Sequence, residues 1–405
     1  MNKKLGLLTS IPNYSLTYFT LSIYYLASSL TNWQLISNVK GQTLFGDLNL
    51  ILSYSKCHNN ESSALLVSQC ESSFVYGQSL LTIIRFFNIN YTFVNVIGYC
   101  LMIVTLICAI ELFRLIKPFP SFKHEIVTIL YLASPPVVLL FERGNLDSLI
   151  FILTTISVFL FLKKYSLSSQ FLIFLATIIK FYPILIAYIN YKLSKSKVIK
   201  IGNLLLLIFS ILFTITFLFT VNLQFIPNPT RVAFGSSLFG KSLNQLFGID
   251  ISRIWQLLIG VMLLISSYIF LSIISKKYSL LAEYKFKLVS LSPTLKYILF
   301  VYSSVYFFTF FLSMNFDYRL IFLLPIYCVI LSMQFKYKMY FVIISISSIW
   351  FSFQIYKLEI IGDLFLFLFT FIYFFLVMPD YKTTKIFLQK NLAFIQAHDR
   401  STRQR

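Results

Sequence analysis

The chain has little charge, little cysteine and little histidine for its 405 residues. Charged residues make up 12% of it, against about 25% in an ordinary soluble domain, while hydrophobic residues make up 58%. The three histidines and five cysteines show no paired spacing of the kind that binds zinc. This composition excludes an ordinary soluble domain, and the spacing gives no sign of a metal site.

Two common catalytic motifs are also missing. The sequence has no phosphate-binding glycine loop of the nucleotide hydrolases and no Gly-x-Ser-x-Gly elbow of the serine hydrolases. The net charge of +20 is strongly basic, but most Lys and Arg residues lie in short segments between apolar runs and in the C-terminal tail. Such cations orient a membrane protein and meet anionic lipid, so we predict no nucleic-acid partner.

Long apolar runs recur along the chain, and each is long enough to cross a hydrocarbon core of about 30 Å. We therefore predict an all-α bundle of about ten spans with Lys3 and Lys4 in the cytoplasm, the first span being retained rather than cleaved. The spans with predicted bounds are roughly 14–30, 94–113, 126–140, 149–162, 204–219, 255–272, 342–353 and 364–377.

The domain organisation follows from these runs. Residues 1–379 form one transmembrane domain, and residues 380–405 form a basic cytoplasmic tail. The first outer loop, residues 31–90, is too rich in Leu, Ile and Phe to be free, so we expect one or two amphipathic helices along the membrane face. Cys57 and Cys70 lie in this loop and could form a disulfide if it faces an oxidising compartment.

A re-entrant hairpin is predicted between Lys164 and Lys192. Fewer than about 30 residues separate these two basic ends, and both are expected on the cytoplasmic side. Lys180-Phe181-Tyr182-Pro183 lies midway and places a charge before a helix breaker. Two short helices that enter and turn back would present Lys180 to the interior, whereas a single span kinked at Pro183 is the alternative.

Strongly polar side chains gather in Phe141-Glu142-Arg143-Gly144-Asn145-Leu146-Asp147, between two apolar runs. The stretch is too short to hold its charges clear of a membrane, which favours a functional site over an ordinary loop with a glycine turn and an N-capping Asp147. The same topology places several further polar residues on the outer side: Asp47, Arg231, Lys241, Asp317 and Arg319. A carboxylate that faces several cations suits a base acting beside a bound phosphate.

The charged stretch, followed some thirty residues later by Lys180-Phe181-Tyr182-Pro183, resembles glycosyltransferase family 87. Those are mannosyltransferase-like enzymes with the polytopic C-type fold that use polyprenyl-phosphate sugars. Other segments match in order: Phe45-Gly46-Asp47, Phe74-Val75-Tyr76, Ser242-Leu243-Asn244, and Tyr318-Arg319 followed by Pro325. The resemblance covers roughly residues 10 to 375.

The resemblance implies roles for individual residues. Asp47 would be the general base, and Arg143, Lys180 and Arg319 would bind the donor phosphate through charge-assisted contacts. Asn145 and Asp147 would hold the turn or bind sugar hydroxyls. The remaining implied substrate-binding residues are Glu142, Tyr182, Lys241, Asn244 and Tyr318.

The implied function is transfer of a hexose from a polyprenyl-phosphate donor to a lipid-linked or cell-envelope glycan, with mannose as the favoured hexose. The reaction would take place on the outer face of the plasma or inner membrane. No cofactor is predicted, and the sequence does not require a divalent cation. A transporter or flippase of lipid-linked saccharides, or a saccharide polymerase, is the alternative, since both also need buried cations near the outer leaflet.

Overall fold

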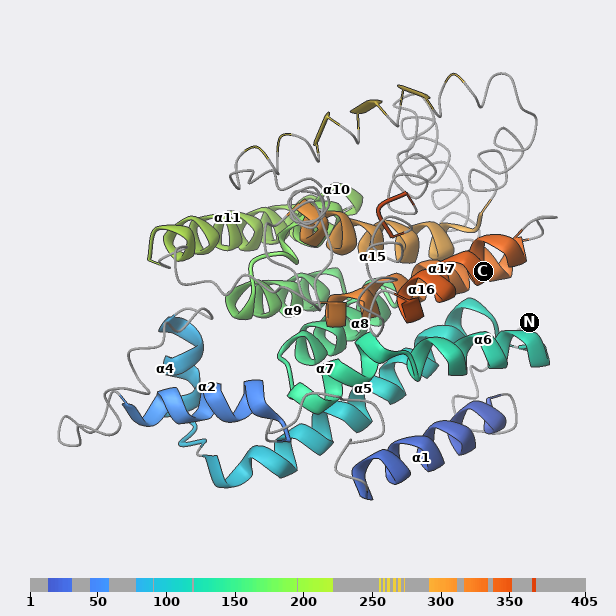
Figure 1. The fold of residues 1–405 in the computed structure, drawn as a ribbon. Coiled ribbons are helices and arrows are strands. Elements are labelled where there is room, and N and C mark those ends of the chain that lie inside the picture. Colours follow the sequence, from blue (N-terminus) through green and yellow to red (C-terminus); the bar gives the residue numbers. More distant parts are fainter. Residues whose placement is uncertain are drawn as a thin grey trace, which may run out of the picture.

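The computed structural model describes most of the chain up to residue 220 and parts of the remainder. The described residues are 14–30, 44–57, 78–89, 91–118, 120–194, 196–220, 291–311, 317–333, 338–351 and 366–368, with isolated positions between 255 and 273. Every regular element in this part of the chain is a helix (Figure 1). The predicted all-α class is therefore confirmed for the described residues.

The helices are short to medium in length, and those from α5 to α11 follow one another with brief connections (Figure 1). In the first half they are α1 Ser15–Leu30, α2 Gly46–Cys57, α4 Gln78–Phe86, η1 Tyr91–Phe93, α5 Val94–Ile116, α6 Phe122–Leu132 and α7 Pro135–Arg143. In the second they are α8 Asp147–Leu162, α9 Ser166–Ile179, α10 Ile184–Leu193, α11 Lys197–Thr220, α15 Pro293–Phe311, η3 Asp317–Leu323, α16 Leu324–Ser332 and α17 Lys338–Phe351.

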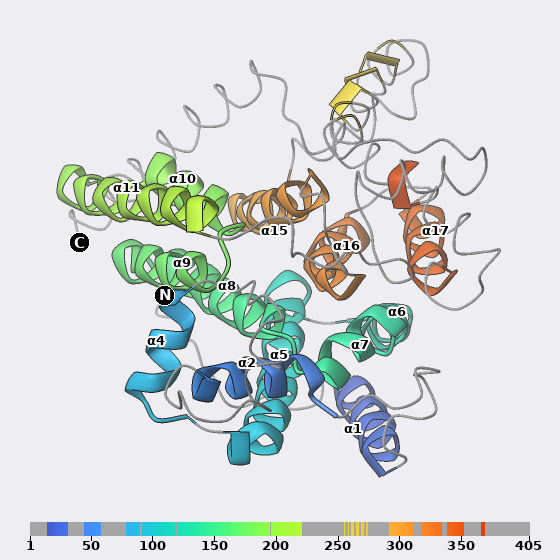
Figure 2. The same ribbon diagram turned by 60° about the vertical axis from the view of Figure 1, so that its left-hand side comes forward.

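Helix α8 lies at the centre of the bundle. It packs against α5 and α7 on one side and against α9 and α15 on the other, as Figure 2 shows. Ile150, Phe151 and Val158 of α8 have no exposed surface. Helices α9, α10 and α11 pack against one another, and α2 lies over α5 and α7. The first turn of α8 is thus surrounded by elements from distant parts of the sequence.

Several helices present apolar side chains outward and are long enough to span a membrane. Within the described residues, Tyr91–Ile116 and Lys197–Thr216 pass this test, and the pair α6–α7, bent by 49°, makes a third if it is one span. Outward-facing Phe19, Val96 and Ile201 are each at least 60% exposed. These three stretches match the spans predicted at 94–113, 126–140 and 204–219, and they are fewer than the ten spans predicted for the whole chain.

The bend between α6 and α7 has a local cause. Ser134 adopts an extended backbone (φ −67°, ψ 149°), as expected for a residue before proline, and Pro135 begins the next helix. Helix α7 then ends at Gly144, whose φ of +59° is the left-handed conformation that glycine adopts most easily. Pro135 and Gly144 therefore set the length of α7 and aim the following turn at the start of α8.

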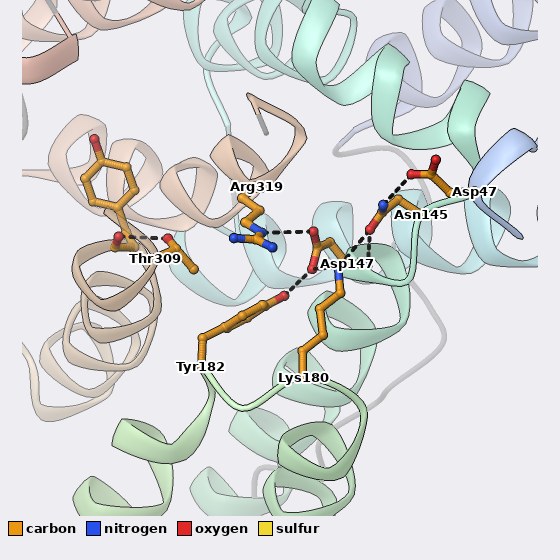
Figure 3. Close-up of polar contacts among 8 residues, drawn as sticks. Asp47, Asn145, Asp147, Lys180, Tyr182, Thr309 and Arg319 are labelled. Atoms are coloured by element: carbon orange, nitrogen blue, oxygen red, sulfur yellow. Dashed lines mark hydrogen bonds and ion pairs between the residues drawn. The ribbon is translucent and has the colours of Figure 1, made fainter. Parts of the chain in front are cut away.

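The predicted break after Lys180 is present. Helix α9 ends at Ile179, Lys180 is extended (φ −147°, ψ 130°), and α10 begins at Ile184. Helices α9 and α10 pack against each other, so the chain reverses at Lys180–Pro183 (Figure 3). This geometry agrees with two short helices joined by a turn rather than with one kinked span.

Residues 31–90 contain the helices that their apolar content predicts. Leu48, Ile51 and Leu52 of α2 are buried, and α4 buries Leu80 and Ile84. On α4, Phe86 remains 82% exposed, so the helix has one buried and one exposed apolar edge. Helix α2 packs against α4 and also against α7.

Replacing Gly98 by Ala should destabilise the protein, because Phe45 occupies the space that a side chain would need. A Cβ atom at Gly98 would lie 2.5 to 2.6 Å from three ring carbons of Phe45, which has no exposed surface. Phe45 also has a φ of 57° and an edge-on contact with Tyr99, so it cannot move freely. We expect a loss of about 1–3 kcal/mol in the free energy of unfolding, measured in detergent.

The matched control is Gly202→Ala. There the added Cβ would meet one methyl carbon of Leu167 at 2.9 Å, and this flexible side chain can turn away. We expect little change or a small gain, since alanine favours a helix more than glycine does. Equal losses in the two variants would contradict the tight packing of Phe45 on α5.

Candidate functional site

Four separate segments place polar side chains at one end of α8. Asp47 lies in the first turn of α2, Asn145 and Asp147 lie in the turn between α7 and α8, and Lys180 begins the α9–α10 turn. Arg319 comes from η3. Figure 3 shows these side chains pointing toward one another. Residues as far apart in the sequence as Asp47 and Arg319 thus meet in one cluster, and direct contacts join residues up to 172 positions apart.

Asp47 is held by two donors from the α7–α8 segment. Arg143 directs both Nε (2.8 Å) and Nη2 (2.5 Å) at the Asp47 Oδ1 atom. The other oxygen, Oδ2, accepts a hydrogen bond from Asn145 Nδ2 at 2.6 Å. The candidate base and one candidate phosphate-binding cation are therefore in direct contact.

Asp147 is the centre of the second half of the cluster. Its Oδ1 atom accepts from Lys180 Nζ at 2.8 Å and from the Tyr182 hydroxyl at 2.5 Å. Its Oδ2 atom accepts from Arg319 Nε at 3.3 Å, and the Arg319 guanidinium lies 5.5 Å from the centre of the Tyr182 ring. One carboxylate therefore orients two cations and a phenol.

Asn145 connects the two halves and caps α8. Its Oδ1 atom accepts from Lys180 Nζ at 3.0 Å and from the backbone N–H of Asp147, also at 3.0 Å. Because Oδ1 serves these donors, Nδ2 faces Asp47. The Asn145 side chain thus accepts the first backbone N–H of α8, whereas Asp147, the capping residue of the alternative loop interpretation, is the first residue of the helix. Figure 3 shows the continuous line of contacts from Asp47 to Arg319.

Backbone contacts fix the outer segments of the cluster. The Phe45 N–H donates to the Glu142 carbonyl at 2.7 Å, which joins the start of α2 to the end of α7. The Tyr131 hydroxyl donates to the Leu320 carbonyl and so ties η3 to α6. Glu142, predicted to bind substrate, is only 7% exposed. Neither of these backbone contacts has a signature in the sequence.

Charge and burial vary across the cluster. The three cations and two carboxylates leave one net positive charge. The Asp147 side chain has no exposed surface, and those of Lys180 and Arg319 are 9% and 13% exposed. Arg143 is 30% exposed and Asp47 is 12% exposed. The cluster is therefore most accessible at the Arg143–Asp47 pair, where a ligand can arrive without first displacing the core.

The opposite end of the same helices is basic. Helix α8 runs from Asp147 to Leu162 and spans about 24 Å, after which Lys163 and Lys164 follow. Helix α10 ends beside Lys192, and α11 begins at Lys197. The lysines and the cluster are thus separated by the length of one helix, as the predicted topology requires.

The structure brings together most of the residues predicted for the site. Asp47, Arg143, Asn145, Asp147, Lys180, Tyr182 and Arg319 are joined by the contacts above. Lys241, Asn244 and Arg231 lie outside the described residues, as do the side chains of Tyr318, Cys57 and Cys70. Among the described residues, no three side chains of metal-ligating types come together.

Comparison of the chain with protein-family models, with curated proteins and with solved structures gives no significant match. The chemistry of the site is therefore argued from its own geometry.

Proposed function

We propose that the chain is a membrane glycosyltransferase. It would transfer a hexose, with mannose favoured, from a polyprenyl-phosphate donor to a lipid-linked or cell-envelope glycan on the non-cytoplasmic face. The supporting fold would be the full bundle of about ten spans with a re-entrant hairpin, of the C type that the sequence resembles.

The observation that carries this proposal is the junction of two carboxylates with three cations at the end of apolar helices. Asp47 is in contact with Arg143, and Asn145 links it to Lys180, whose partner Asp147 also holds Arg319. Charged groups at membrane depth are costly and are retained mostly for function. A net positive cluster that includes the Asp47 carboxylate, whose side chain is 12% exposed, suits an anionic donor and a hydroxyl acceptor.

The proposed reaction uses each group in one step. The acceptor hydroxyl gives its proton to the Asp47 carboxylate, and its oxygen forms a bond to C1 of the hexose. The bond from C1 to the phosphate oxygen breaks, and its electron pair leaves with the polyprenyl phosphate. Arg143, Lys180 and Arg319 stabilise the charge that develops on this leaving group. Asp147 acts through the two cations and the Tyr182 hydroxyl that it orients.

The partners follow from the same reaction. The donor's polyprenyl tail would lie in the bilayer against the exposed apolar faces of the helices, and the acceptor would approach from the aqueous side. Lys241, Asn244 and Tyr318 are proposed as further sugar-binding or acceptor-binding residues on the basis of the resemblance alone. The protein would be an integral membrane protein of the plasma or inner membrane.

Membranes that contain the expressed protein should incorporate label from polyprenyl-phosphate mannose or glucose into a larger glycan, above the level of matched membranes without it. The alternative is a flippase or polymerase of lipid-linked saccharides. A flippase moves the labelled donor between leaflets without changing it, and a polymerase joins preassembled lipid-linked units rather than single hexoses. Either of those results, with no incorporation from either donor, would contradict the proposal.

A further inference from the structure

The Asp47 carboxylate occupies the Arg143 guanidinium. Both Nε and Nη2 contact a single oxygen of Asp47, at 2.8 and 2.5 Å. Two parallel N–H groups of this kind are also the arrangement with which arginine grips a phosphate. Because Arg143 is the most exposed cation of the cluster, an incoming anion reaches this pair first.

We infer that Asp47 competes with the donor phosphate for Arg143, so that donor binding itself releases the base. This inference rests on the proposed function and concerns the regulation of the same site. Arg143 and Asn145 engage both oxygens of the Asp47 carboxylate through short contacts. When a phosphate takes the Arg143 N–H groups, Asp47 loses two charge-assisted contacts, and its Oδ1 atom becomes available to the acceptor hydroxyl.

Asn145 gives phosphate binding a second way to loosen the contacts that hold Asp47. Its Oδ1 atom accepts from Lys180 Nζ while its Nδ2 atom donates to Asp47, and the positive charge strengthens that donation. A phosphate that draws Lys180 away therefore weakens the remaining bond to Asp47 as well. The consequence is an ordered reaction in which the acceptor hydroxyl is deprotonated only in a site that already holds the donor.

The test is a double-mutant cycle on the binding of a short-chain polyprenyl phosphate to the purified protein in detergent. Asp47→Asn should bind this probe more tightly than the wild type, by about fivefold, because Arg143 is no longer held by a carboxylate. Arg143→Gln should bind it more weakly. In the Arg143→Gln background, Asp47→Asn should raise the affinity for the probe by less than about twofold. A gain of that size is what removing a negative charge supplies through long-range electrostatics alone.

Glu111→Gln is the matched control, since it removes a different carboxylate that accepts from an arginine, Arg114, at 2.6 Å near the far end of α5. It should leave the affinity for the probe unchanged. A gain in affinity cannot arise from partial unfolding, so the expected sign is itself informative. No gain with Asp47→Asn, or an equal gain in both backgrounds, would overturn the competition.

The cycle also separates this inference from the proposed function. Binding that follows the expected pattern, with no sugar transfer by the wild type, would support the competition and contradict the enzyme. Transfer by the wild type, with no gain in affinity for Asp47→Asn, would support the enzyme and contradict the competition. A wild type that binds no polyprenyl phosphate would contradict both.

Discussion

Asp47→Asn should reduce the rate of sugar transfer by about 10²–10⁴-fold, the usual contribution of a general base. The amide has nearly the same shape as the carboxylate and can still accept a hydrogen bond from Arg143, but it cannot take the proton of the acceptor. The measurement is the initial rate of label transfer from the polyprenyl-phosphate donor that the wild type uses, normalised to the amount of folded protein.

This loss should not reflect unfolding. The Arg143 side chain is 30% exposed, so it keeps contact with water and can still donate to the amide oxygen that Asp47→Asn introduces; the change should cost about 1 kcal/mol of stability or less. Elution in size-exclusion chromatography and the unfolding midpoint should therefore remain close to those of the wild type. A transfer rate within about twofold of the wild type would remove Asp47 from the mechanism.

Asp147→Asn should have the largest effect on stability. Its side chain has no exposed surface and neutralises two cations, Lys180 and Arg319, that are themselves largely buried. The amide keeps the shape but leaves these charges uncompensated, and removal of one partner of a buried ion pair costs about 3–5 kcal/mol. We expect a loss of this size in the free energy of unfolding, measured by denaturant titration in detergent.

A second substitution should reveal the cause of that loss. Lys180→Met removes one of the two stranded cations, so the variant carrying both Asp147→Asn and Lys180→Met should be more stable than Asp147→Asn alone. Glu111→Gln, which breaks an exposed pair with Arg114, should change stability by less than about 1 kcal/mol. A loss for Asp147→Asn no greater than that of Glu111→Gln would contradict the buried cluster.

Much of the local structure around the site could be predicted from single residues. Pro183 with its preceding charge indicates the break between α9 and α10, and Gly144 indicates the turn that ends α7. The break that Pro135 makes between α6 and α7 was missed, because residues 126–140 were predicted as one span. These residues act through backbone dihedral angles, which depend mainly on local sequence. The apolar pattern of residues 31–90 likewise predicted helices α2 and α4.

The contacts within the site could not be predicted from the sequence in the same way. Arg143 pairs with Asp47, while Lys180 and Arg319 pair with Asp147. This pairing depends on packing between segments that lie 33 to 172 positions apart. The role of Asn145 as cap and bridge follows from two bonds that only the folded turn creates. The number of spans was predicted from hydropathy and the positive-inside rule, and α8, at about 24 Å, is shorter than the bilayer core.

The most direct test of the central claim is an assay of sugar transfer by the purified protein. The protein is reconstituted in liposomes with a labelled polyprenyl-phosphate hexose and an extracted glycolipid acceptor. The measured quantity is the label that becomes covalently attached to the acceptor. The account predicts attachment with the wild type and almost none with Asp47→Asn at equal amounts of folded protein. The account would be contradicted if the label crossed between leaflets while remaining on its original lipid, to the same extent with the wild type and with Asp47→Asn.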